Sequence, residues 1–102
     1  MKHNIYSMYD SKTLQYRPLN MFLNDGVAER AVSELFQGEA NDYTKYPEDF
    51  TLMHLGTFDD ETGSIELGDT IRPVVHLWEL RSKLVQQAKA AQAELGSDES
   101  LN

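Results

Sequence analysis

The sequence predicts a single α+β domain in which a small antiparallel sheet, built from two hairpins, packs against helices. Two patterns predict this class: two pairs of strand-like runs are each joined by a short turn, and two segments have the apolar spacing of amphipathic helices. Their order is β-β-α-β-β-α, ending in a long C-terminal helix. Consecutive hairpins make the sheet antiparallel, and the helices then pack on it. We expect the domain to span residues 1–95, followed by an acidic flexible tail at residues 96–102.

The first hairpin is predicted near the N-terminus, where consecutive segments have the composition of strand, turn and strand. Residues 5–9 (IYSMY) are rich in β-branched and aromatic side chains, residues 10–13 (DSKT) favour a turn, and residues 14–17 return as a strand. Pro18 ends that strand because proline has no amide hydrogen to donate to a sheet.

A helix is predicted over residues 25–37. Asn24 or Asp25 supplies a side chain that accepts hydrogen bonds from the free amides of the first turn. Apolar residues then recur at four-residue spacing in two adjacent rows, Val27, Ala31, Leu35 and Ala28, Val32, Phe36. Gly38 marks the end of the helix, and the polar segment 38–49 that follows is predicted to be a loop.

The second hairpin is predicted from a strand at residues 50–58 and a short returning strand at residues 64–67. The loop between them ends in Gly63, which adopts a positive φ without strain. Gly68 and Asp69 predict a further turn. For residues 70–76 two alternatives stay open: a strand that pairs with the sheet, or a direct lead into the last helix with Pro73 in its first turn.

The last helix is predicted to reach Leu95 and to end at Gly96. One face carries apolar residues at steps of three and four, namely Leu77, Leu80, Leu84, Ala88, Ala91 and Leu95. The stretch beyond Ala88 is too long for a small sheet to shelter. We therefore expect a homodimer that forms through this helix.

Composition excludes several classes of function. The chain has 102 residues and no cysteine, so disulfides, thiolate metal sites and a cysteine nucleophile are excluded. GxSxG, P-loop, GxGxxG and HExxH motifs are absent, the histidines share no helical spacing, and the acidic loop 59–63 lacks the EF-hand ligand pattern. We expect a protein that is not an enzyme and that binds no cofactor or metal.

No segment approaches the roughly 18 apolar residues that a membrane span requires. The N-terminal residues MKHNIYSMYDSK contain no apolar run of signal-peptide length. We therefore expect a protein that is neither secreted nor inserted in a membrane.

The net charge of −8 is unevenly distributed along the chain. Residues 24–69 carry twelve Asp and Glu residues against Arg30 and Lys45, whereas residues 1–23 and 70–95 each have a small basic excess. Phosphate binding depends on Lys and Arg, so the total charge argues against nucleic acid while the two basic segments allow it. The acidic balance predicts modest, salt-sensitive binding.

Tyrosines and cations alternate in the first hairpin, which is the pattern of a surface that stacks single-stranded bases beside phosphate-binding groups. Ordinary half-buried strand tyrosines are the alternative interpretation. The predicted DNA-binding set combines the tyrosines and cations of the first hairpin with cations of the two predicted helices and of residues 70–76. It consists of Lys2, Tyr6, Tyr9, Lys12, Tyr16, Arg17, Arg30, Arg72, Arg81 and Lys83.

Several stretches together resemble the small nonstructural protein of gokushoviruses, which are tailless single-stranded-DNA bacteriophages of the Microviridae. They are YSMYD at 6–10, NDGVAERA at 24–31, YPEDF at 46–50 and LGTFDDETG at 55–63. The resemblance implies a DNA-binding phage protein of the host bacterial cytoplasm, absent from the mature capsid, that assists the switch from duplex replication to single-strand synthesis and packaging. It implies no catalytic residue. Arg30 lies at a matched position and either meets phosphate or pairs with Glu34.

Two functions follow as expectations. The first is a non-enzymatic protein that binds single-stranded DNA during viral genome replication. The second is an acidic protein-interaction module that recruits or regulates phage replication or capsid-assembly proteins through residues 24–69.

Overall fold

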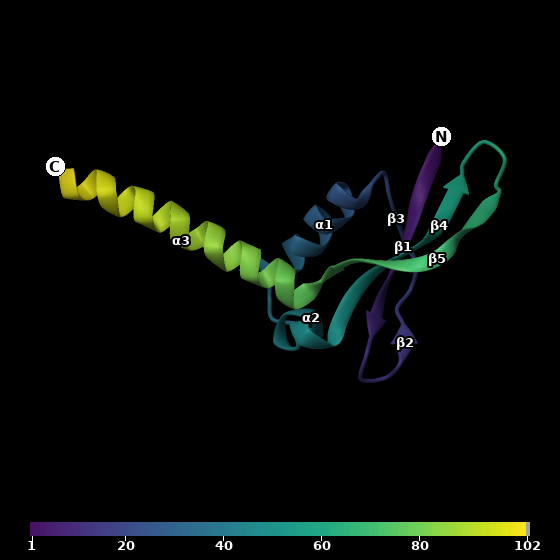
Figure 1. Cartoon of the computed structure of the whole chain (residues 1–102), viewed down its shortest axis with the longest axis horizontal. Helices are drawn as coiled ribbons and strands as arrows, with labels where there is room; N and C mark the ends of the chain where they lie inside the picture. The colour runs from purple at the N-terminus through teal and green to yellow at the C-terminus, as the bar shows by residue number, and fades with distance from the viewer. Residues whose placement is uncertain (102) are drawn as a thin grey trace.

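The computed structural model describes the backbone of residues 1–101 and the side chains of residues 1–93. It confirms the α+β class, with an antiparallel sheet at one end and a long helix at the other (Figure 1). The strands are β1 (Lys2–Asp10), β2 (Gln15–Tyr16), β3 (Asn20–Phe22), β4 (Phe50–Asp59) and β5 (Ile65–His76). The α-helices are α1 (Asp25–Ser33), α2 (Asp42–Lys45) and α3 (Leu77–Leu101), and short 3-10 turns lie at Glu34–Phe36 and Pro47–Asp49.

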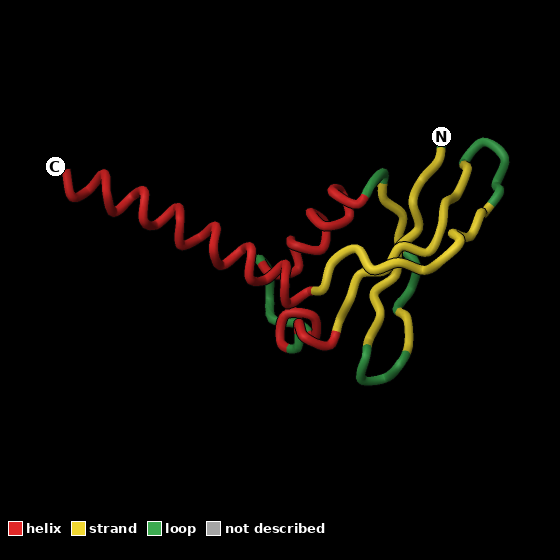
Figure 2. The backbone as a smooth tube through the Cα atoms, viewed as in Figure 1, coloured by secondary structure: helices red, strands yellow, loops and turns green. Residues whose placement is uncertain are grey.

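The sheet has the strand order β2-β1-β4-β5. β3 also pairs with β1, along residues 4–6, whereas β2 pairs with it at residues 9 and 10. β1 is therefore bordered by β4 on one side and by both β2 and β3 on the other, all antiparallel. β5 is the opposite edge strand. Figure 2 shows the strands gathered at one end of the molecule, with α1 beside the sheet.

The core lies between one face of the sheet and the helices. Tyr6 and Met8 of β1 share this face with Phe50 and Leu52 of β4, and with Val75 of β5. The helices contribute the buried side chains Ala28, Val32, Leu77 and Leu80. The period-2 alternation of a strand thus places Tyr6 and Met8 of β1 on the face that packs against the helices.

The start of α1 is as predicted. Asn24 is extended and its side chain accepts a hydrogen bond from the Val27 amide at 2.9 Å, which satisfies one free donor of the first turn. The α-helix ends at Ser33 and continues as the turn Glu34–Phe36, so the predicted helix 25–37 is present with a tighter last turn.

Residues 70–76 belong to β5, so the strand is the correct one of the two alternatives, with Pro73 opposite Met53 and α3 beginning at Leu77. The turn predicted at Gly68 and Asp69 is wrong, because β5 continues through these residues. Gly56 pairs with Leu67, and His54 pairs with Arg72, so residues 68–71 form a bulge opposite Leu55. Gly68 and Asp69, whose composition predicts a turn, lie in this bulge. Pro73 is tolerated because β5 is an edge strand.

Two short elements were not predicted. The segment 38–49 contains α2, whose first turn is closed by a capping box between Asn41 and Thr44. The spacing of Asn41 and Thr44 is the signal that would have indicated a helix start in this polar loop. The strand β3 spans only Asn20–Phe22.

Helix α3 projects from the domain. The principal extents are 61 × 33 × 24 Å and the radius of gyration is 17.2 Å, whereas a compact chain of this length has a radius of about 13 Å. Every described side chain from Val85 to Ala93 is exposed, as expected for a helix too long for the sheet. The helix passes Gly96, the predicted end, and reaches Leu101. The predicted mobility of the tail 96–102 lies outside the described side chains.

Candidate nucleic-acid interface

Tyr6, one of the predicted stacking residues, is an internal residue of the fold. Its side chain has no exposed surface, and its ring lies 5.3 Å from that of His54 and 5.8 Å from that of Phe22. The hydroxyl donates a 2.7 Å hydrogen bond to Asp25. Burial, and then the Asp25 carboxylate, raises the pKa of Tyr6 above its ordinary value. Tyr6 therefore holds the sheet to α1 and has no free face on which a base can stack.

Arg72 is likewise held within the protein. Its guanidinium donates to both Asp25 oxygens, at 2.9 and 3.1 Å, and so bridges β5 to the first residue of α1. The hydrogen bonds from Arg72, together with the Tyr6 hydroxyl, lower the pKa of Asp25. The nearby His54 has a lowered pKa, chiefly because burial desolvates its imidazole and secondly because Arg72 is positively charged. The ring donates its Nε2 hydrogen to Asn4 at 2.8 Å.

We expect Asp25→Asn to weaken the fold and to reduce its sensitivity to acid. The pKa of Asp25 is lower in the folded chain than in the unfolded chain, so its stabilisation is present above about pH 4 and is lost as pH falls further. Asp25→Asn should cost about 1 kcal/mol at pH 7 and flatten the stability profile below about pH 4. Urea denaturation at a series of pH values measures this. Asp69→Asn, at an exposed carboxyl of β5, is the control, and equal profiles for both variants would contradict the assignment.

Two further predicted cations contact acidic groups. Arg17 lies 3.4 Å from the buried carboxylate of Asp10, with its guanidinium 5.6 Å from the Phe50 ring centre and 5.9 Å from that of Tyr43. Lys2 lies 3.9 Å from Glu66. Arg17 thus packs the first hairpin onto β4 and α2, and Lys2 belongs to the acidic end of the sheet.

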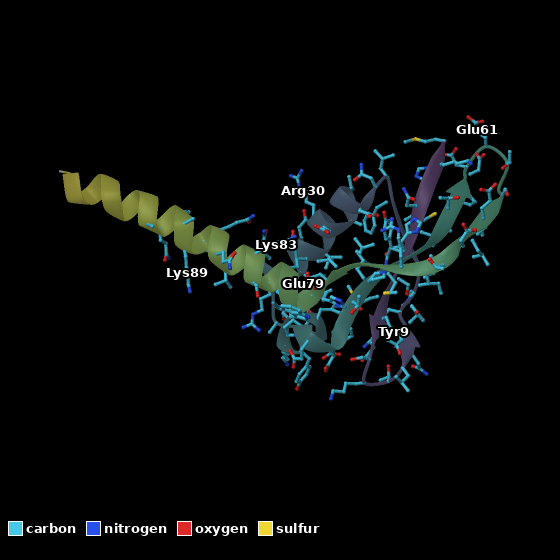
Figure 3. All side chains as sticks on the ribbon, viewed as in Figure 1. Tyr9, Arg30, Glu61, Glu79, Lys83 and Lys89 are labelled. Atoms are coloured by element: carbon cyan, nitrogen blue, oxygen red, sulfur yellow. The ribbon has the colours of Figure 1, made fainter. Side chains whose placement is uncertain are left out.

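The tip of the first hairpin keeps the predicted arrangement of aromatic and basic groups. Tyr9 and Tyr16 are cross-strand partners whose ring centres lie 4.8 Å apart. Tyr16 is 47% exposed, Tyr9 is half-buried, and Lys12 lies in the exposed turn between the two strands. The structure thus pairs Tyr9 with Tyr16, and Figure 3 shows Tyr9 away from Arg30 and Lys83.

Arg30 and Lys83 both line a groove of about 330 Å³ between α1 and α3, which the acidic Glu29 also lines. Figure 3 shows Lys83 on the side of α3 that faces α1. Among the described side chains neither residue forms an ion pair, including the pair of Arg30 with Glu34 that the sequence left open. Both cations are exposed.

A second groove on α3, of about 410 Å³, contains an aromatic residue that was not among the predicted site residues. Trp78 is 51% exposed, its ring lies nearly parallel to His76 with centres 6.3 Å apart, and Arg81 and Lys89 line the same groove. Glu48 is the acidic residue of its rim. The sequence signal for this groove is an aromatic residue, Trp78, followed by cations three and eleven positions later, Arg81 and Lys89.

Residues 3–81 match the family model described as Phage ORF5 protein. The chain belongs to the Phage ORF5 protein family. It is therefore a bacteriophage protein. No curated protein and no solved structure matches it.

The part of this Phage ORF5 protein that matches the family model includes the whole sheet, α1 and the first turn of α3. Arg30 and Trp78 lie inside that range, whereas Lys83 and Lys89 lie beyond it. The core and the hydrogen bonds of Tyr6, Asp25 and Arg72 thus lie within the matched range, and the projecting part of α3 lies beyond it.

Acidic side chains gather at the β4–β5 turn of this Phage ORF5 protein. At the β4–β5 turn, the terminal ammonium of Met1 lies 2.7 Å from Asp60 and 3.6 Å from Glu61, and His3 lies 2.8 Å from Asp60. Hydrogen bonds from the N-terminus and His3 lower the pKa of Asp60. Glu61 lies at the far end of the molecule from Lys89 (Figure 3).

Within the described residues no group of acidic and histidine side chains has the arrangement of a metal site. No described helix is long and apolar enough to cross a membrane.

Proposed function

We propose that this phage protein is a non-enzymatic single-stranded-DNA-binding protein of a gokushovirus. In this proposal it acts in the host cytoplasm and assists the switch from duplex replication to synthesis and packaging of single strands. The observation that carries it is the half-exposed Trp78, which shares an open groove with Arg81 and Lys89. An aromatic platform beside cations binds single strands with little sequence preference.

The distribution of ion pairs refines the predicted DNA-binding set. Lys2, Arg17 and Arg72 already neutralise carboxylates of the protein. Exposed cations that have no such partner among the described side chains are free to neutralise phosphates, namely Lys12, Arg30, Lys45, Arg81, Lys83 and Lys89. Four of these lie on α1 and α3, so we place the principal interface there and give the tyrosine hairpin a secondary role.

Fluorescence anisotropy with a labelled oligonucleotide of mixed sequence at low salt tests the proposal. We expect binding that weakens steeply as salt is added, because each neutralised phosphate of a single strand contributes about −0.7 to the slope of log K against log salt. Absence of binding at tens of micromolar protein would refute direct DNA binding.

Three variants distinguish binding in the Trp78 groove from non-specific attraction of DNA to positive charges. Trp78→Ala should weaken binding by about 1–3 kcal/mol, the contribution of one stacked base. Lys89→Gln should reduce the salt slope by about 1, whereas Lys45→Gln, the same change on α2, should leave it unaltered. Equal effects of the two lysine variants would show that the groove is not the interface.

The alternative, an acidic protein-interaction module, is favoured by a different observation. The edge strand β5 exposes Ile65 by 61% and Leu67 by 80%, beside the acidic residues Glu66 and Asp69. An edge strand with exposed apolar side chains is able to pair with a strand of a partner. Under this alternative the anisotropy assay finds no binding, and Trp78 has no role.

A further inference from the structure

One face of α3 begins in the core and continues beyond it without a partner. Leu77 and Leu80 are buried, Leu84 is half-buried, and Ala88 and Ala91 are exposed. These residues follow one another at steps of three and four, so they lie in one row along the helix. The row that anchors α3 to the sheet is thus the same row that emerges from the domain. We call the part of the row that is not buried, namely Leu84, Ala88 and Ala91, the α3 seam.

The projecting part of α3 needs stabilisation from outside the domain. Isolated helices shorter than about 12–15 residues are marginal in water, and most helices are stabilised by packing of one apolar face. Beyond Leu84 all described side chains of α3 are exposed. The small side chains of Ala88 and Ala91 allow another helix to approach closely at the middle of this segment.

We propose that the α3 seam binds the α3 seam of a second copy of this chain, with the two helices antiparallel. Charge selects this occupant and this direction. Residues 77–89 carry Arg81, Lys83 and Lys89 against Glu79, whereas residues 90–102 carry only acidic residues, Glu94, Asp98 and Glu99. Antiparallel pairing places the basic half of each helix beside the acidic half of the other, whereas parallel pairing places acid against acid.

The arrangement has a two-fold axis near Ala88 and Ala91, so each copy supplies the same surface. Trp78 and Lys89 lie on a different side of α3 from the seam, since they are offset by roughly a third of a turn at 100° per residue. Pairing through the seam therefore leaves Trp78 and Lys89 accessible, and Arg81 is the residue that borders both surfaces.

Sedimentation equilibrium over a range of concentrations tests self-association. We expect a species of twice the 11.6 kDa chain mass. Ala88→Glu with Ala91→Glu should convert it to monomer, because the charges would face each other across the axis. Ala90→Glu with Ala93→Glu is the matched control: the composition, charge and helix are the same, but the changes lie on the other side of α3, and the dimer should persist.

A monomer of the unaltered chain at all concentrations, a larger assembly, or equal loss of mass in both double variants would overturn the proposal. Circular dichroism of the two double variants shows whether each keeps its folded domain. Pairing direction is measured separately, because the chain has no cysteine and Ser82→Cys gives a single labelling site. Spin labels at this site should lie about 20 Å or more apart in an antiparallel pair. Labels about 10 Å apart, the spacing of neighbouring helices, would indicate a parallel pair and would refute the antiparallel arrangement.

Discussion

Replacing Gly56 with alanine should lower the free energy of unfolding by about 3 kcal/mol, which is near the upper end for an overpacked site. Gly56 lies in β4 between Ile5 of β1 and Leu67 of β5. A Cβ at this position would overlap the carbonyl oxygen of Glu66 and lie 3.0 Å from the Leu67 Cα. These are backbone atoms, so the strain cannot be relieved by a side-chain rotation and must displace β5.

Gly38→Ala is the control for this prediction. A Cβ at Gly38 meets no atom within 4 Å, and alanine also reduces the freedom of the unfolded chain, so this variant should be neutral or slightly stabilising. Urea denaturation monitored by Trp78 fluorescence measures both variants. If Gly56→Ala is as stable as Gly38→Ala, then β5 does not pack against β4 at this point as the structure describes.

Leu77→Ala should lower the free energy of unfolding by about 2–5 kcal/mol, the range for a fully buried leucine. Leu77 has no exposed surface and is the first residue of α3, directly after the β5 strand. The cavity would lie where the helix meets the sheet. We therefore expect α3 to loosen from the domain before the sheet unfolds, with an early fluorescence change at Trp78.

Leu67→Ala makes the same chemical change at a leucine that is 80% exposed. Its effect should stay within about 0.5 kcal/mol, as for ordinary surface substitutions. Thermal and urea denaturation of the two variants give the comparison. A cost at Leu67 that equals the cost at Leu77 would mean that the edge of β5 is covered in solution.

The parts of the fold that were predictable are those set by near neighbours in the sequence. Asn24 caps α1 through an amide three residues away, and Gly63 turns the second hairpin with a φ of +76°. The strands around Tyr6 and Phe50 have β-branched and aromatic composition over their own length. In each case the residues that decide the structure lie within one turn or one strand.

The parts that were not predictable depend on contacts between distant segments. Gly68 and Asp69 have the composition of a turn, but pairing with β4 on both sides carries the chain through them as a bulge. The sequence predicts that Arg72 binds DNA, whereas in the structure its guanidinium donates a hydrogen bond to Asp25, which lies 47 residues away in the chain. Strand alternation puts Tyr6 and Tyr9 on opposite faces of β1, and only the position of α1 decides that the face of Tyr6 is the internal one.

The place of β1 in the sheet has a consequence for the order of folding. β1 is the N-terminal strand, yet its partner β4 pairs Asp10 with Phe50 and Lys2 with Asp59. Such pairings between distant segments carry a large loop-closure entropy and make folding slow compared with helical domains. During synthesis the first hairpin must wait on the ribosome until β4 has emerged. The β1 edge that β4 will occupy is open in that interval, and this is when the nascent chain is most exposed to mispairing.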